Sequence, residues 1–174
     1  RRNGIRAKMT VARLGVDINL FKPAADKRHW KRKIGLDPDK TVIGYVGRIS
    51  KEKNTEVLLE AFEKLEPGFQ LLMVGDGPDS EKEPFKKMKH CKVTGFVNNV
   101  QDYLKAMDIF VMPSLTETTS LATLEAMSCG LPVIATKVGF MQKYIVKDHN
   151  GLFFPRNQST VLALKLTKLA ASAE

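Results

Sequence analysis

Two carboxylates eight positions apart, Glu117 and Glu125, flank the start of a predicted helix and are the first candidates for chemistry in this 174-residue chain. Between them lie Thr118, Thr119 and Ser120, residue types that favour helix N-caps. Because free amides and the helix dipole attract anions, this first turn can hold phosphate oxygens. Glu125, inside the helix, must face a polar cavity or be paired. It is placed to accept hydrogen bonds from a hydroxyl pair of a ribose or hexose, the alternative being an ordinary helix-face glutamate.

Cationic side chains follow the first predicted strand, in the loop 47–54 that leads into a helix. Arg48 offers a planar fork suited to phosphate oxygens, and Lys53 adds a point charge. Together they could neutralise a diphosphate, and a solvated loop is the alternative interpretation. The loop 75–78 after the second strand reads Gly-Asp-Gly-Pro and lacks a third glycine. A tight turn is therefore favoured there over a dinucleotide fingerprint.

The hydrophobic pattern predicts the sheet that must position these loops. Short β-branched runs alternate with amphipathic segments, which is typical of βαβ units and a parallel sheet. The predicted strands are 41–46, 69–74, 91–94, 109–112, 132–136 and 152–154, and the predicted helices are 27–34, 55–65, 80–89, 100–107, 120–129 and 159–171. This order predicts an α/β, Rossmann-like, doubly wound parallel sheet, in which ligands bind outside the carboxyl ends of the strands near a switch in strand order.

Bulk composition excludes several classes of protein. With 43% hydrophobic and 27% charged residues, the chain is expected to fold as a single ordinary domain. Cys91 and Cys129 have no CxxC spacing and no histidine at ligand spacing, so neither a zinc site nor a disulfide framework is indicated. No apolar run approaches the roughly 20 residues of a spanning helix. A reducing, cytoplasmic compartment is the expectation.

The net charge of +9 makes phosphorylated ligands, polyanions and anionic lipid surfaces plausible partners. Much of the excess lies in three segments, 1–13, 27–33 and 86–92. Solvated helix faces are favoured over a nucleic-acid patch, because aromatic residues are sparse there and no RNA- or DNA-binding motif occurs. No nucleic-acid partner is therefore expected.

A set of short motifs follows the predicted elements in a fixed order. The set comprises Gly15-Val16-Asp17, Val46-Gly47-Arg48 with Glu52-Lys53, Val74-Gly75-Asp76-Gly77-Pro78, Gly95-Phe96-Val97, residues 108–114, Glu117 with Leu124-Glu125-Ala126-Met127, residues 130–139, and Asn150-Gly151-Leu152. From about Gly15 to about Leu169 the chain resembles the retaining glycosyltransferases of family 4 (group 1). These enzymes have the GT-B fold of two facing Rossmann-like domains, and the resemblance is to the C-terminal one.

The resemblance implies roles for the candidate residues. Arg48 and Lys53 would bind the donor diphosphate and stabilise charge on the leaving group, and the family does not need a bound metal. Glu117 would contact the donor sugar and completes the implied catalytic set, while Glu125 would hold the ribose hydroxyls. The remaining implied binding positions are Phe96 and Val97 near the base, Gly47 beside Arg48, and Thr118, Thr119, Ser120 and Leu121, with the backbone around Thr119 to Leu121 meeting the phosphates.

The chain departs from the family pattern at several positions. Where the family commonly has Glu-Gly-Phe-Gly, this chain has Glu117 followed by Thr-Thr-Ser, residues that keep cap chemistry but restrict backbone angles. The usual Asn before Gly-Val-Asp is Leu14, and the usual second glycine of a later loop is Phe140. In that loop Gln142 and Lys143 replace a common acidic position.

The resemblance also predicts organisation and function. Residues 1–174 would form a single nucleotide-sugar-binding domain, with 1–14 as a possible flanking segment. The acceptor domain of a longer enzyme would precede it. The basic start without Met fits a fragment or a processed chain. The parent would transfer a hexose, with retention, from a UDP-, GDP- or ADP-sugar to a glycan or lipid-linked acceptor in polysaccharide biosynthesis. It would work in the cytoplasm or at the inner membrane face, and the domain alone would be inactive. The alternatives are a GT-B sugar-nucleotide epimerase domain and a non-catalytic nucleotide-binding module.

Overall fold

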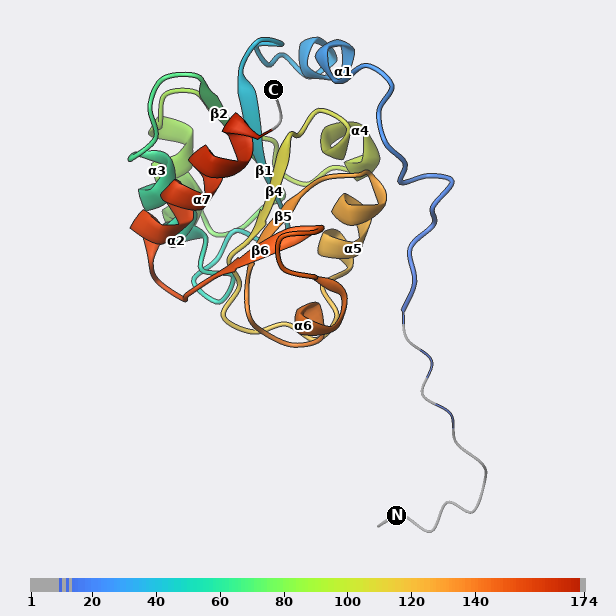
Figure 1. The fold of residues 1–174 in the computed structure, drawn as a ribbon. Coiled ribbons are helices and arrows are strands. Elements are labelled where there is room, and N and C mark those ends of the chain that lie inside the picture. The colour runs from blue at the N-terminus through green and yellow to red at the C-terminus, as the bar shows by residue number, and fades with distance from the viewer. Residues whose placement is uncertain (1–9, 11, 13, 173–174) are drawn as a thin grey trace.

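Six parallel strands form one sheet in the computed structural model, which describes residues 10, 12 and 14–172 (Figure 1). The strands are β1 Thr41–Val46, β2 Phe69–Val74, β3 Cys91–Val93, β4 Ile109–Met112, β5 Val133–Thr136 and β6 Gly151–Phe154. Their spatial order is β3-β2-β1-β4-β5-β6. The α/β, Rossmann-like, doubly wound fold predicted from the sequence is confirmed.

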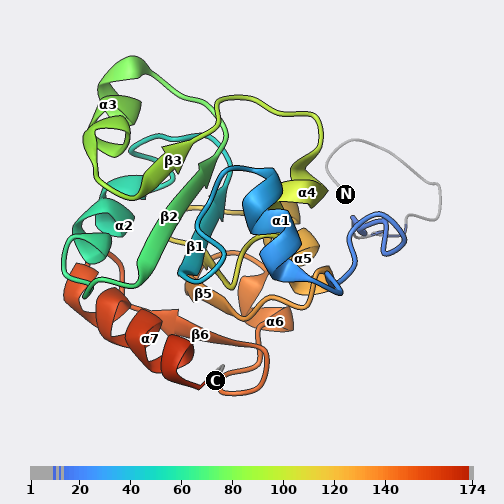
Figure 2. The ribbon, with the colours of Figure 1, turned by 90° about the horizontal axis from the view of Figure 1, so that it is seen from above.

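Helices cover both faces of this sheet. They are α1 Lys27–Lys33, α2 Thr55–Phe62, α3 Asp79–Lys87, α4 Val100–Leu104, α5 Leu121–Ser128, α6 Met141–Tyr144 and α7 Ser159–Ala171. Figure 2 shows α2, α3 and α7 on one side of the sheet and α4 and α5 on the other. Strands covered on both faces need apolar side chains throughout, and every residue of β4 and β5 is buried.

The predicted elements are present with shifted ends. Helix α2 ends at Phe62 rather than at residue 65, and α4 ends at Leu104 rather than at residue 107. Strand β5 begins at Val133 because Pro132 has no amide hydrogen to donate to a ladder. Helix α6 was not predicted, since one turn is too short to produce a periodic pattern.

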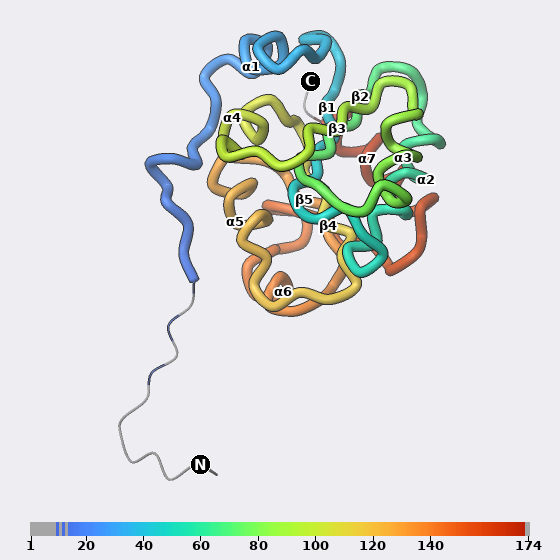
Figure 3. The backbone as a smooth tube through the Cα atoms, turned by 180° about the vertical axis from the view of Figure 1, so that it is seen from behind, coloured from blue at the N-terminus to red at the C-terminus, as the bar shows by residue number. Residues whose placement is uncertain are grey.

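The segment before α1 lies along the outside of α5, as Figure 3 shows from behind. The hydroxyl of Ser128, at the end of α5, donates to the carbonyl of Phe21. A Cβ added to Gly130 would lie 3.3 Å from the ring of Pro23. The predicted flanking segment 1–14 lies almost wholly outside the described residues.

The strand order reverses between β1 and β4. The chain builds outward through β2 and β3, returns to pair β4 with β1, and then continues outward through β5 and β6. The loops after β1 and β4 consequently leave the sheet side by side and diverge to opposite faces. This is the switch point at which open α/β sheets bind ligands.

Candidate functional site

An ion pair joins the two loops at the switch point. Lys53, in the loop after β1, places its Nζ 2.8 Å from Oε1 of Glu117, in the loop after β4. The side chain of Lys53 is 25% exposed and that of Glu117 is 11% exposed. Two predicted site residues from segments 64 positions apart thus meet, and both retain access to solvent and to a ligand.

Two further contacts hold these loops together. The amide of Leu115 donates to the carbonyl of Glu52 at 3.1 Å, and Nδ2 of Asn54 donates to the carbonyl of Pro113 at 3.2 Å. Asn54 is buried and left-handed (φ 53°), a conformation that asparagine tolerates better than most residues. These hydrogen bonds therefore fix the backbone on both sides of the Lys53–Glu117 pair.

Arg48 stands at the open end of the same loop. Its guanidinium is exposed and makes no hydrogen bond or ion pair with any residue that the structure describes. The backbone carbonyl of Arg48 accepts a hydrogen bond from the buried Tyr45 hydroxyl at 2.7 Å. This bond fixes the backbone and does not involve the guanidinium. Burial, with the nearby charge of Glu117, raises the pKa of Tyr45 above its usual range, so this hydroxyl stays protonated and keeps donating.

The glycine-containing loop after β2 supports the loop of Arg48. The amide of Gly47 donates to the carbonyl of Val74 at 2.9 Å. A Cβ added to Gly75 would lie 2.0 Å from the carbonyl oxygen of Gly47, and Gly75 has a φ of +138°. The predicted tight turn therefore has a second purpose, which is to let two backbones approach closely.

The N-terminus of α5 differs from the prediction. The hydroxyls of Thr118, Thr119 and Ser120 were expected to cap the helix, but the N-cap residue Ser120 makes no side-chain cap hydrogen bond. Its Oγ instead lies 2.8 Å from Oγ1 of Thr123, because Ser120 is left-handed (φ 53°) and turns its side chain inward. The first turn contains no acidic residue. The Thr123 amide donates to the Ser120 carbonyl at 3.1 Å, whereas the amides of Leu121 and Ala122 have no partner among the described residues and can bind an anion.

Glu125 lies in the second turn of α5. It is partly buried, and its carboxylate accepts no hydrogen bond from the part of the chain that the structure describes. Desolvation raises its pKa above the usual carboxyl range. The carboxylate is thus not paired among the described residues, and its contact with ligand hydroxyls stays a prediction.

The remaining predicted positions lie around this centre. Phe96 and Val97 follow β3, two strands from β1; Phe96 is 79% exposed while Val97 packs against the core. The amide of Gly75 donates to the carbonyl of Gly95 at 3.1 Å, which ties this loop to its neighbour. Leu121, the first residue of α5, is 39% exposed.

A cavity of about 530 Å³ adjoins Glu117. Its lining residues come from the loop after β4, the loop after β5 and α6: Glu117, Thr118, Lys137, Gly139, Phe140, Gln142 and Lys143. The sequence had not pointed to Lys137, although it directly follows a predicted strand, as ligand-binding residues of this fold do. This cavity gives the candidate site a hollow next to its central carboxylate.

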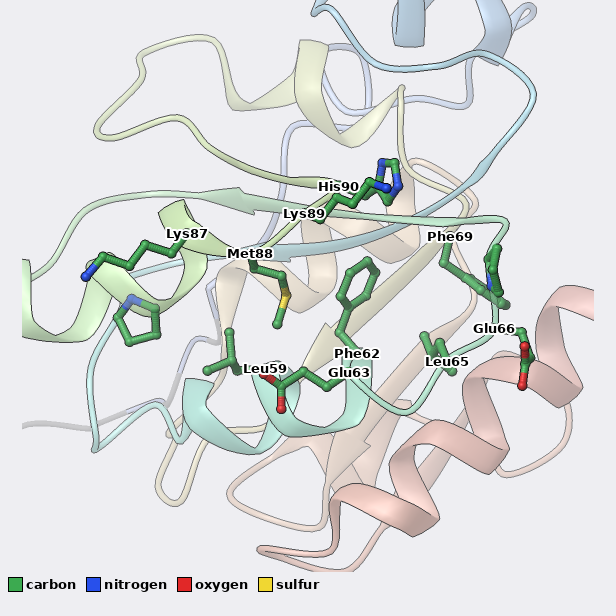
Figure 4. A pocket seen from close by; sticks show the side chains of 12 residues that line it. Leu59, Phe62, Glu63, Leu65, Glu66, Phe69, Lys87, Met88, Lys89 and His90 are labelled. Carbon is green, nitrogen blue, oxygen red and sulfur yellow. The ribbon is translucent and has the colours of Figure 1, made fainter.

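A second cavity, of about 670 Å³, lies away from this site (Figure 4). Leu59, Phe62 and Met88 extend into it from α2 and the end of α3. Phe69, also in its lining, begins β2, so this hollow is near the amino ends of the strands. Ligand binding at the switch point does not involve it.

The second basic segment, 27–33, is largely neutralised within the fold. Lys31 and Lys27 both contact Asp108, with Nζ–O distances of 2.6 and 3.6 Å, and Lys33 lies 3.2 Å from Asp102. Arg28 pairs with Asp39. The first basic segment lies outside the described residues except at positions 10 and 12. These pairs agree with a structural, solvated helix face for α1.

The described residues contain no cluster of His, Cys, Asp and Glu suited to a metal ion, and none of their helices is long and apolar enough to cross a membrane. Cys91 and Cys129 are free thiols, and burial raises the pKa of Cys129 to about 11.

Known proteins resemble this chain in both sequence and fold. The D-inositol 3-phosphate glycosyltransferase of Segniliparus rotundus is 32% identical over 83% of this chain and 35% of its own length. The sulfoquinovosyl transferase SQD2 of Arabidopsis thaliana is 36% identical over 79% of this chain and 28% of its own length. The chain thus spans about a third of these relatives.

Two solved structures share the fold of this chain. Anabaena HepE, in complex with UDP and glucose, superposes with a TM-score of 0.80 at 26% identity, covering 90% of this chain and 45% of HepE. The C-terminal domain of the group 1 glycosyl transferase LpcC of Francisella tularensis superposes with a TM-score of 0.77 at 31% identity, covering 90% of this chain and 88% of that domain. The fold is therefore that of the C-terminal half of a GT-B enzyme. The family model described as glycosyl transferases group 1 matches residues 26–174, and the chain belongs to this family.

Proposed function

We propose that this chain binds the nucleoside-diphosphate sugar donor of a retaining glycosyltransferase and that the protein containing it transfers a hexose. The observation that carries the proposal is the Lys53–Glu117 pair, a cation and a carboxylate 2.8 Å apart at the switch point of the sheet. A donor of this kind presents an anionic diphosphate beside a hydroxyl-rich sugar. The pair matches these two chemistries side by side.

Arg48, Lys53 and the N-terminus of α5 would receive the diphosphate. When the bond between the anomeric carbon and the phosphate oxygen breaks, negative charge grows on that oxygen. Fixed cations and helix amides stabilise this charge more than they stabilise the intact donor, which lowers the barrier. Within the described part of the chain the guanidinium of Arg48 has no partner and α5 has no side-chain cap at its N-terminus, and both observations support this assignment.

Glu117 would contact the donor sugar and Glu125 the ribose. The cavity beside Glu117 has room for a sugar ring, and the partly desolvated carboxylate of Glu125 would gain hydrogen bonds by accepting from the two ribose hydroxyls. The exposed ring of Phe96, with Val97, would lie near the base, and Gly47 would contact the donor beside Arg48. HepE supports a uridine donor, since its solved complex contains UDP and glucose.

The acceptor site would belong to an N-terminal domain of the longer protein, which makes this domain inactive in transfer by itself. Isothermal titration of the chain with UDP, GDP and ADP tests donor binding. Measurable binding of at least one nucleotide is expected, and a folded chain that binds none of them contradicts the proposal.

Activity of the longer protein separates transfer from its alternatives. Lys53→Ala and Glu117→Ala are each expected to abolish hexose transfer to the acceptor. Interconversion of sugar nucleotides without an acceptor would identify an epimerase. Binding without either reaction would identify a non-catalytic module.

A glycan or lipid-linked acceptor at the cytoplasmic face of a membrane would fit the net charge of +9. Liposome flotation of the chain checks this, with recovery expected on vesicles containing anionic lipid. Equal recovery on neutral vesicles would count against it.

A further inference from the structure

The cavity beside Glu117 is more positive than a pocket for a neutral hexose needs to be. We propose that it takes a donor whose sugar carries a carboxylate, a hexuronic acid, and that Lys137 and Lys143 recognise this group. The inference rests on the proposed function, because it concerns the sugar end of the same donor.

The charges around the cavity are unbalanced. Lys137 and Lys143 line it together with Glu117, which is its one acidic lining residue. The charge of Glu117 is already matched by Lys53 at 2.8 Å. Two positive charges remain on the wall of a hollow of about 530 Å³. Such a pocket favours an anionic substituent over a hydroxyl group.

The two lysines have no acidic partner of their own. Among the described residues, neither side chain takes part in an ion pair or a side-chain hydrogen bond, although Lys31 and Lys82 both do. Both side chains are exposed at the cavity wall, where their ammonium groups can contact a bound carboxylate.

The backbone holds these lysines beside Glu117. The amide of Phe140 donates to the carbonyl of Thr118 at 2.8 Å, which joins the loop after β5 to the loop after β4. A Cβ added to Gly139 would lie 2.2 Å from the carbonyl of Glu117. The hydroxyl of Tyr144, one residue beyond Lys143, donates to the carbonyl of Thr119. The sugar-contacting carboxylate and the lysines therefore form one pocket.

Titration of the chain with matched sugar nucleotides tests the inference. The chain covers 88% of a domain that has been solved by itself, so it is suitable as the sample. UDP, UDP-glucose and UDP-glucuronate are compared at low salt, or GDP, GDP-mannose and GDP-mannuronate if guanine is the base. We expect the uronate to bind about five- to tenfold tighter than the neutral sugar, with the difference shrinking as salt rises.

Single variants assign the preference to residues. Lys137→Gln and Lys143→Gln should each weaken uronate binding about threefold and affect the neutral donor less, and Lys143→Glu should abolish the preference. Lys147→Gln, an exposed lysine of the next loop that does not line the cavity, is the matched control and should change neither affinity. Thermal unfolding confirms that each variant is folded.

The outcomes separate the inference from the proposed function. If the nucleoside diphosphate binds but the two sugar nucleotides bind equally, the uronate inference is wrong and donor binding stands. A preference that survives in both glutamine variants also overturns it. If no nucleotide binds, donor binding itself is wrong.

Discussion

The ammonium of Lys53 and the carboxylate of Glu117 lie 2.8 Å apart across the junction between the loops after β1 and β4. The contact orients the carboxylate before a ligand arrives. A diphosphate bound there, as proposed, would share Lys53 with Glu117, which would couple donor binding to the position of Glu117.

Lys53→Ala should weaken binding of the nucleoside diphosphate by about tenfold or more, because a charge-assisted contact to phosphate is lost. It should also lower the free energy of unfolding by about 1–2 kcal/mol, since the mostly buried Glu117 loses its partner. Titration calorimetry and urea unfolding measure the two effects. Lys51→Ala, an exposed lysine of the same loop, is the control; equal losses in both variants would contradict the specific role of Lys53.

Gly75→Ala should destabilise the domain by about 2–4 kcal/mol, because the new Cβ would lie 2.0 Å from the Gly47 carbonyl oxygen. Gly68→Ala is a matched control. Gly68 has a similar φ of +128° but no atom within 4 Å of an added Cβ, so it should lose only about 1–2 kcal/mol. The midpoints of urea unfolding give the comparison. Equal losses would show that backbone angle alone, and not the approach of the two loops, requires glycine at position 75.

Ser120 should respond differently to glycine and to alanine. Ser120→Ala keeps the strained left-handed backbone and loses the bond to Thr123, so it should cost about 1–2 kcal/mol. Ser120→Gly loses the same bond but relieves about 1 kcal/mol of strain, which should leave stability nearly unchanged. Chemical unfolding of both variants at one pH decides the matter, and alanine being as stable as glycine would be the contrary result.

Glu125→Gln should raise thermal stability at neutral pH while weakening nucleotide binding. Desolvation raises the folded-state pKa of Glu125 above its ordinary value of 4.5, so the folded state holds this proton more tightly than the unfolded chain does. The wild type therefore loses stability as pH rises from the unfolded to the folded pKa, and the penalty is complete above the folded pKa.

Well below pH 4.5 Glu125 is protonated in both the folded and the unfolded wild type, and the advantage of Glu125→Gln should disappear. Melting temperatures of the two proteins across the acid range provide the measurement. An advantage that stays constant down to low pH would mean that packing, and not ionisation, distinguishes the variant. Glu56→Gln, an exposed glutamate on α2, is the control.

The alternation of short apolar runs with amphipathic segments along the chain was enough to predict the class of fold and the position of most elements. Continuous apolar runs such as β1 and β4 have few other stable uses than the interior of a parallel sheet. Element ends were less predictable, because a helix end such as that of α2 is set by tertiary packing more than by local propensity. The single turn of α6 has no periodicity to detect. Burial of Met141 and the hydrogen bond from the Tyr144 hydroxyl to the carbonyl of Thr119 stabilise it, and Thr119 is distant in sequence.

For the site, residue types and their order indicated Arg48, Lys53, Glu117 and Glu125, since the carboxyl ends of parallel strands must share an edge. Only the tertiary structure decided which of them meet. Lys53 pairs with Glu117, whereas Arg48 and Glu125 keep polar groups without a hydrogen-bonding partner among the described residues. It also turned the Ser120 hydroxyl away from the helix amides and placed Lys137 and Lys143 around one cavity. Such pairings depend on backbone angles and on the separation of loops distant in sequence, and local sequence encodes neither.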